Sequence, residues 1–185
     1  MSKMPSLLER NQHFASTYTA VPLGPPNAQV LVVTCLDHRV DPATFLELEL
    51  GDAPVIRNTG GRVTPAVIND VAFFAFIAGQ MFGGEDAAEP LFEVAVVHHT
   101  QCGSGFLADD DFRRGYAQLI GADESDLRDE AVLDPAVTVA ADVNRLRSSA
   151  AISPRVTVSG HVYDVDTGLV KTVVPAPGTR DGSRR

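Results

Sequence analysis

Short runs of apolar, mostly β-branched residues recur along the chain, separated by more polar segments. The runs are AQVLVVT (28–34), PVIRN (54–58), LFEVAVVHH (91–99) and RVTVSGHVYD (155–164). Strands that are buried on both faces of a sheet have such near-continuous apolar runs, whereas half-exposed strands alternate apolar and polar residues. The pattern therefore predicts a set of buried, parallel-type strands.

Helix-start signals lie between these runs. Asp41, Thr64 and Asp134 each precede a proline, so a side-chain oxygen at the N-cap is followed by proline at the first helical position. The helices that these signals predict span residues 42–49, 65–79 and 135–147. The segment DDDFRRGYAQLIGA (109–122) predicts a further helix, because three acidic residues near its start favour the helix dipole.

The two ends of the chain have their own patterns. Residues 6–19 predict an N-terminal helical arm, which a breaker-rich stretch, PLGPPN, separates from the first strand. Near the other end, YDVDTGLVKTVV predicts a hairpin that turns at residues 166–168. The last residues, 175–185, predict a disordered tail.

Strands that alternate with helices predict an α/β fold, with a central, mainly parallel β-sheet flanked by helices and an antiparallel C-terminal hairpin. A chain of 185 residues can bury a substantial core. We therefore expect one domain over residues 1–185, in which residues 1–28 form the N-terminal arm and linker.

Composition narrows the possible partners and the compartment. The net charge of −9 and the sequence pI of about 4.9 argue against nucleic acid or an anionic membrane as a partner. The N-terminal residues lack the apolar core of a secretory signal, and no segment is long and apolar enough to cross a bilayer. We therefore expect a cytoplasmic protein without a nucleic-acid or membrane partner.

The chain has only two cysteines, Cys35 and Cys102, and both lie near the ends of predicted strands. Ligand sites of parallel sheets lie at the carboxyl ends of the strands, where the segments TCLDHRV, RNTGGRV and HHTQCG are all placed. Two thiolates and a nearby imidazole form a soft set of three ligands that suits zinc and leaves a fourth position for water. The alternatives are two inert buried cysteines or, less compatible with the expected compartment, a disulfide.

The residues beside Cys35 add to this interpretation. Asp37 and Arg39 follow it at alternate positions, which share one side of an extended segment. An aspartate near a metal can accept a hydrogen bond from metal-bound water, and an arginine can hold that aspartate ionised. The alternative is an ion pair with a purely structural role.

The spacing of these residues resembles a known family. The segments CLDHR and HHTQCG resemble the paired C-x-D-x-R and H-x-x-C-G signatures of the β-class carbonic anhydrases. The segment VIRNTGGRV is similar to the V-x-R-N-A-G segment of that family, and VSGHVYDVDTG is similar to its late hairpin. The likeness covers most of residues 30–170 in the order of the family.

The resemblance implies specific roles. Cys35, His99 and Cys102 would bind one Zn²⁺ per chain, and Asp37 with Arg39 would form the catalytic dyad. The reaction would be the reversible hydration of carbon dioxide to bicarbonate and a proton, by a zinc-bound hydroxide that Asp37 orients. The family also implies a homodimer or a higher homo-oligomer, with the site at or near the subunit interface.

Two histidines depart from the pattern of the family. His38 lies between Asp37 and Arg39, where a small residue is common, and His98 precedes His99, where glycine is common. Either could act as a proton shuttle, because imidazole titrates near neutral pH, or could belong to the surface or to the surroundings of the site. The H-x-x-C register favours His99 over His98 as the ligand.

Other functions remain as alternatives. The same zinc scaffold resembles that of hydrolases that act on carbonyl sulfide or carbon disulfide, and the metal motif does not separate these substrates from carbon dioxide. A non-enzymatic zinc or thiol redox module is a further alternative. It would leave Asp37 and Arg39 without a role, which counts against it.

Overall fold

The computed structural model describes residues 2–81 and 90–178. Within them a five-stranded sheet has the order β2-β1-β3-β4-β5, and three of its four strand pairs are parallel. Its last pair, β4 with β5, is antiparallel, which confirms the predicted mainly parallel sheet with a C-terminal hairpin. The strands are β1 (Val30–Cys35), β2 (Val55–Asn58), β3 (Phe92–His99), β4 (Val156–Tyr163) and β5 (Val170–Val174).

Helices connect these strands and confirm most of the predicted helix starts. The carboxylates of Asp41 and Asp134 accept hydrogen bonds from the first turns of their helices, and the hydroxyl of Thr64 accepts one from the Val67 N–H. The helices are α1 (Met4–Thr17), α2 (Pro42–Phe45), α3 (Pro65–Met81), α4 (Asp110–Ile120), α5 (Glu124–Asp129) and α6 (Pro135–Ser148), with short 3₁₀ helices η1 (Thr59–Gly61) and η2 (Gly103–Ala108).

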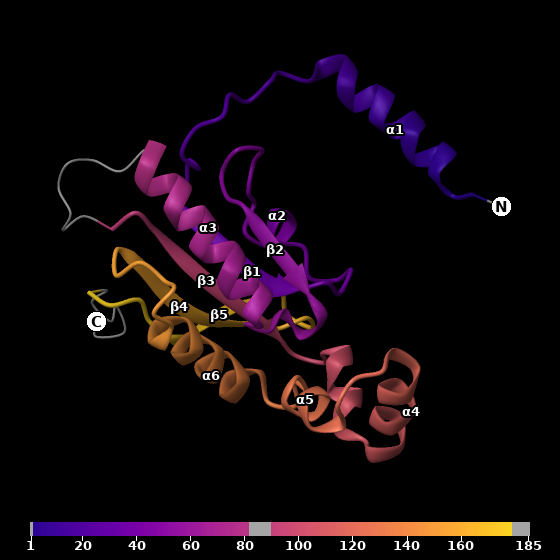
Figure 1. The fold of residues 1–185 in the computed structure, drawn as a ribbon. Coiled ribbons are helices and arrows are strands. Elements are labelled where there is room, and N and C mark those ends of the chain that lie inside the picture. Colours follow the sequence, from indigo (N-terminus) through magenta and orange to yellow (C-terminus); the bar gives the residue numbers. More distant parts are fainter. Residues whose placement is uncertain (1, 82–89, 179–185) are drawn as a thin grey trace.

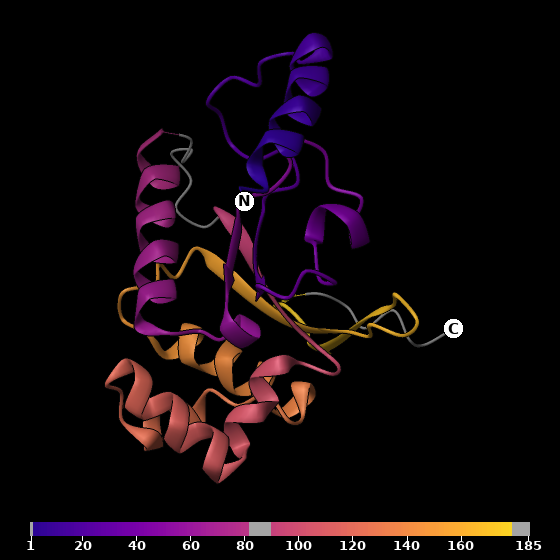
Figure 2. The ribbon, with the colours of Figure 1, turned by 90° about the vertical axis from the view of Figure 1, so that its right-hand side faces the viewer.

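The main core lies between one face of the sheet and two helices. Figures 1 and 2 show α3 and α6 on the same side of the sheet. Alternate strand residues, such as Val94 and Val96 of β3, pack there against Val71 of α3 and Val143 of α6. All four side chains are fully buried. This packing fixes the carboxyl ends of β1 and β3, which carry the candidate ligands.

Two helix predictions need correction. The helix predicted over 42–49 ends at Phe45, because Glu47 has a left-handed backbone (φ 52°) and the Asp52 carboxylate accepts a hydrogen bond from the Glu49 N–H, which folds the segment into turns. Helix α5, whose N-cap is Asp123, was not predicted. In α4, Asp109 is itself the N-cap, so only two acidic residues occupy the first turn.

Helix α1 buries none of its residues, and Figures 1 and 2 show it extending away from the sheet. The single domain with an N-terminal arm stays a prediction.

Of the predicted disordered tail, residues 179–185 lie outside the described residues. No helix within the described ranges has the length and hydropathy that a membrane span requires.

Candidate metal centre

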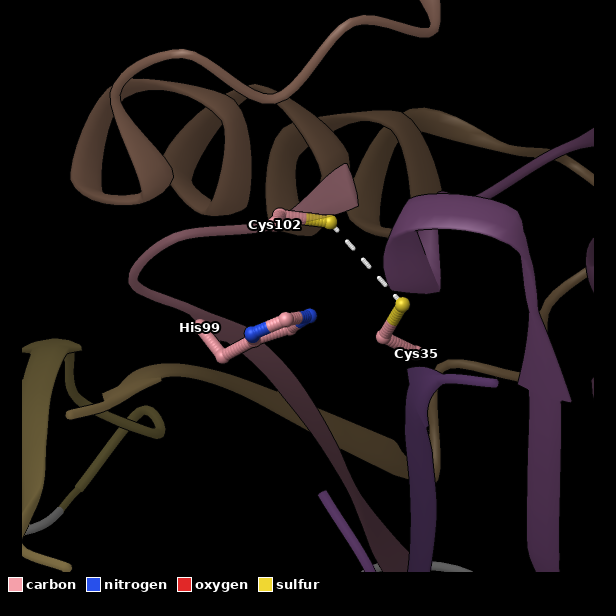
Figure 3. Close-up of side chains that lie close together, drawn as sticks. All are labelled: Cys35, His99 and Cys102. Carbon is pink, nitrogen blue, oxygen red and sulfur yellow. Dashed lines mark hydrogen bonds between the residues drawn. The ribbon is translucent and has the colours of Figure 1, made fainter. Parts of the chain in front are cut away.

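Two side chains from strand ends and one from a nearby loop converge on one point (Figure 3). Cys35 is the last residue of β1, His99 is the last residue of β3, and Cys102 lies in the loop before η2. The two sulfurs are 3.9 Å apart. One ligand atom from each residue lies within 4.8 Å of the others, and this is the only group of three potential metal ligands within the described residues.

The sheet and one turn bring these residues together. Strands β1 and β3 are parallel neighbours, with Thr34 paired to Val97, so their carboxyl ends lie side by side. After His99 the chain reverses at Gln101, whose φ of 56° is in the left-handed region. This reversal returns Cys102 to the end of β1.

The arrangement fits a soft divalent metal. The His99 Nδ1–H donates to the Thr100 carbonyl (2.9 Å), whereas its Nε2 is buried and has no hydrogen-bond partner. Burying a nitrogen without a hydrogen-bond partner costs free energy, and this cost is offset when the nitrogen binds a metal ion. Two sulfurs bound to a tetrahedral zinc at about 2.3 Å would lie about 3.8 Å apart, close to the observed separation.

The two thiols differ in their electrostatics. A hydrogen bond between the sulfurs and burial raise the pKa of Cys35, and the same hydrogen bond lowers the pKa of Cys102. The Ser104 hydroxyl lies 3.2 Å from the Cys102 sulfur and also favours its thiolate. The surroundings therefore favour the thiolate at Cys102 more than at Cys35.

Asp37 and Arg39 form a two-point ion pair beside the thiols. The Asp37 N–H lies 3.4 Å from the Cys35 sulfur, and its carboxylate accepts hydrogen bonds from the Arg39 side chain at 3.0 and 2.7 Å. These bonds hold the pKa of Asp37 well below its usual range. Arg39 also donates to the Gln101 carbonyl (3.0 Å), which links the dyad to the loop that carries Cys102.

A cavity of about 420 Å³ opens beside Cys35 and Asp37. Leu36, Leu107 and aromatic residues of α4 contribute much of its lining, which is largely apolar. The cavity therefore offers a small neutral molecule an apolar path to the Cys35 thiol and the Asp37 carboxylate. Its aromatic lining consists of Phe112 and Tyr116.

The two histidines that depart from the family pattern lie in opposite environments. The His38 side chain is 94% exposed, and its Nδ1 lies 3.7 Å from the Asp37 carboxylate. His98 is fully buried, and its ring nitrogens lie within hydrogen-bond distance of Thr138 and Gly61. His38 thus stays a candidate shuttle, whereas the burial of His98 favours a supporting role within the protein.

Sequence reasoning missed two residues of the site. Arg57 donates to the carbonyls of Cys35 (3.0 Å) and Asp37 (2.7 Å) and so holds the segment after β1. Its position in VIRNTGGRV was a usable signal. Ser104, which contacts the Cys102 sulfur, had no such signal, because a serine after Cys-Gly is common in loops.

Known proteins with similar sequences cover nearly the whole chain. β-Carbonic anhydrase 1 of Mycobacterium tuberculosis is 30% identical over 172 residues, which make up 91% of this chain and 96% of that protein. A carbon disulfide hydrolase of Acidithiobacillus thiooxidans is 35% identical over 81 residues, only 43% of this chain and 35% of that enzyme. No protein-family model matches the sequence.

The structural comparison agrees with the longer sequence match. The crystal structure of a carbonic anhydrase from Streptococcus mutans superimposes with a TM-score of 0.75 and 33% identity, covering 94% of this chain and 98% of that one. The sheet order, the Cys-His-Cys cluster and the extent of both matches lead to one assignment. The chain belongs to the β-carbonic anhydrase family.

Proposed function

We propose that this protein catalyses the reversible hydration of carbon dioxide to bicarbonate and a proton at one zinc ion per chain. Cys35, His99 and Cys102 would hold the metal. The observation that carries the proposal is the buried, unpaired Nε2 of His99 opposite two sulfurs that are 3.9 Å apart. Zinc bound there would supply Lewis acidity that makes water a nucleophile near neutral pH.

In this proposal, Asp37 and Arg39 orient the water molecule that attacks the substrate. The Asp37 carboxylate, ionised through its bonds to Arg39, accepts a hydrogen bond from the reacting water and so directs a lone pair toward the substrate carbon. Three donors of Arg39 occupy both lone pairs of Oδ1 and one of Oδ2, so one lone pair of Oδ2 is left to accept from water. A mere zinc or thiol redox module would not need this pair, so Asp37 and Arg39 support an enzyme.

The cavity suits the substrate. Carbon dioxide is small, linear and without net charge, and the largely apolar lining beside Cys35 solvates it better than it solvates bicarbonate. This difference favours entry of the gas and release of the ion. Carbon disulfide and carbonyl sulfide share the shape and the low polarity of carbon dioxide. The partial match to a carbon disulfide hydrolase therefore keeps these sulfur substrates as the second candidate.

We also propose that the protein is a homodimer or a higher homo-oligomer. Helix α1 buries no residue within its own chain, yet exposes Leu7, Leu8 and Phe14. Of the aromatic stretch of α3, Phe74 packs edge-on against Phe92 in the core, whereas Phe73 and Phe76 are about two-thirds exposed. Exposed apolar surfaces of this kind mark protein interfaces, and sedimentation analysis of the full chain tests the assembly.

Stopped-flow hydration of carbon dioxide, measured on metal-quantified protein, tests the activity. We expect zinc near one per chain in the parent, loss of zinc and activity in Cys102→Ala, and loss of activity with retained zinc in Asp37→Ala. A parent that binds zinc but does not hydrate carbon dioxide from neutral to alkaline pH contradicts the proposal. The same protein would then be assayed for release of hydrogen sulfide from carbonyl sulfide and carbon disulfide.

A further inference from the structure

A turn of two glycines, Gly60 and Gly61, packs against the residues of the candidate metal centre. Gly60 and Gly61 have φ values of 74° and 67°, a conformation that favours glycine at both positions. A Cβ on Gly61 would lie 2.8 Å from the backbone N of Cys35. A Cβ on Gly60 would lie 2.9 Å from the Ser104 hydroxyl. The turn therefore packs against the backbone from which the Cys35 side chain extends and against the serine beside the Cys102 sulfur.

The residues after the turn are anchored to a buried carboxylate on α6. Asp142 is fully buried and accepts hydrogen bonds from the Val63 N–H (3.0 Å) and from the Arg62 side chain (2.7 and 3.2 Å). Arg145 adds a further bond at 2.9 Å. One carboxylate thus fixes both the backbone and the side chain that follow the glycine turn.

The same carboxylate also contacts the strand that carries the candidate histidine ligand. The Nε2 of His98 lies 3.2 Å from the Gly61 carbonyl and 3.3 Å from Asp142, and its Nδ1 lies 2.8 Å from the Thr138 hydroxyl. The Gly61 carbonyl and the Asp142 carboxylate can only accept, so Nε2 carries a proton and donates it to them. His98 therefore ties the end of β3, next to His99, to both the turn and α6.

We propose that Asp142 is a positioning residue for the metal centre, acting through the glycine turn on Cys35 and through His98 on His99. The inference rests on the proposed zinc site. A buried ion pair contributes little net stability compared with apolar packing. The convergence of donors from η1, β3 and α6 on one carboxylate is therefore better explained by the geometry that it enforces on the ligands.

The test compares the metal centres of full-length variants. Asp142→Asn keeps the size of the side chain but replaces the charge and one acceptor oxygen. The control is Val139→Ala, which truncates a fully buried apolar side chain of the same helix and leaves the hydrogen-bonding groups of Asp142 and His98 unchanged. Each protein is loaded with zinc to follow its release to a chromogenic chelator. Each is then loaded with cobalt(II), whose visible and thiolate charge-transfer bands report ligand geometry.

We expect Asp142→Asn to release zinc about 10- to 100-fold faster than the parent, as is common when the supports of metal ligands are removed, and to shift the cobalt bands. Val139→Ala should match the parent in its rate of zinc release and in its cobalt bands. The proposal is overturned by a parent-like Asp142→Asn, or by a Val139→Ala that releases zinc as fast, because release would then follow stability alone.

A milder pair of variants covers the case in which Asp142→Asn does not fold. Thr138→Val removes the hydroxyl that holds His98, and we expect a smaller shift in the same direction, reversed in Thr138→Ser. Parent-like zinc release and cobalt bands in Thr138→Val overturn the proposal. A parent that binds neither metal overturns the zinc site itself and this inference with it. A parent that binds both, with variants that do not differ from it, overturns the positioning role alone.

Discussion

Arg39 holds both carboxylate oxygens of Asp37, with its Nε 3.0 Å from Oδ1 and its Nη2 2.7 Å from Oδ2. The Arg39 N–H adds a third bond to Oδ1 at 2.9 Å. A carboxylate held in this way is fixed in direction as well as in charge. The pair therefore forms one oriented acceptor beside the candidate ligands Cys35, His99 and Cys102.

Replacing Arg39 with lysine separates orientation from charge. Lysine keeps the positive charge but lacks the planar two-point donor, so Asp37 should stay ionised and lose its fixed direction. We expect kcat for carbon dioxide hydration to fall by about 10-fold or more, consistent with lost orientation of a reacting group, at unchanged zinc content. Stopped-flow assays with metal analysis measure both, and parent-like kcat in Arg39→Lys would refute the orienting role.

Gly61→Ala should be far more destabilising than a glycine substitution in open space. The new Cβ would lie 2.8 Å from backbone atoms of Thr34 and Cys35, at a φ of 67°. Strain in the left-handed region costs about 1 kcal/mol or more, and the overpacking adds roughly 1–3 kcal/mol. Gly168→Ala is the matched control, since its φ is 74° and no atom lies within 4 Å of the added Cβ. Urea unfolding measures the free energy of unfolding of both variants. An equal loss of stability in Gly61→Ala and Gly168→Ala would contradict the close packing at Gly61.

Ser104→Ala should weaken metal binding without unfolding the protein. The hydroxyl lies 3.2 Å from the Cys102 sulfur and favours its thiolate form, which is the form that binds metal. We expect about a 10-fold loss of zinc affinity in competition with a chelator. Ser125→Ala, which removes a hydroxyl bonded to Asp123 in α5, serves as the control and should keep the affinity of the parent.

The contribution of Asp142 to stability should depend on pH. Burial opposes its ionisation, but hydrogen bonds from His98 and Arg62 outweigh this and hold the pKa of Asp142 below its usual range. A carboxyl whose folded pKa is depressed stabilises the fold above its unfolded pKa, about 3.9, and this contribution is lost as the pH falls toward the folded value.

The corresponding measurement is urea unfolding of the parent and Asp142→Asn between pH 7 and pH 3. At pH 7 the variant should lose about 3–5 kcal/mol, because Arg62 is left buried without its partner. The difference should narrow below about pH 4. A difference that stays constant over this range would show that the carboxylate charge is not the source of the stability.

Much of the fold was predictable because the central strands β1 and β3 are buried on both faces of the sheet. Continuous apolar runs such as residues 91–99 arise from that burial, and Asp41 and Asp134 cap their helices as their Asp-Pro sequences predict. The end of α2 was not predictable from such signals. It depends on the left-handed conformation of Glu47, which has no special sequence preference for it.

The candidate ligands were placed from the ends of the strands, but their supports were not. Arg62 and Asp142 are 80 positions apart, and no local pattern pairs them. Asp142 did carry one signal, since it lies at helical spacing from buried Val139 and Leu146 and therefore on the inner side of α6. A carboxylate at such a position needs a buried partner, and only the tertiary structure identifies that partner as Arg62.

The two sulfurs of the cluster are separated by 67 positions along the chain. A metal that joins them would act as a reversible crosslink closing a loop of that length. In the chain-entropy description, such a closure restricts the unfolded chain by roughly 4 kcal/mol, in addition to any contacts formed in the native state. The pairing of β1 with β3 would then be reinforced by the same ion that supports catalysis, so depletion of zinc would lower the thermal stability of the protein together with its activity.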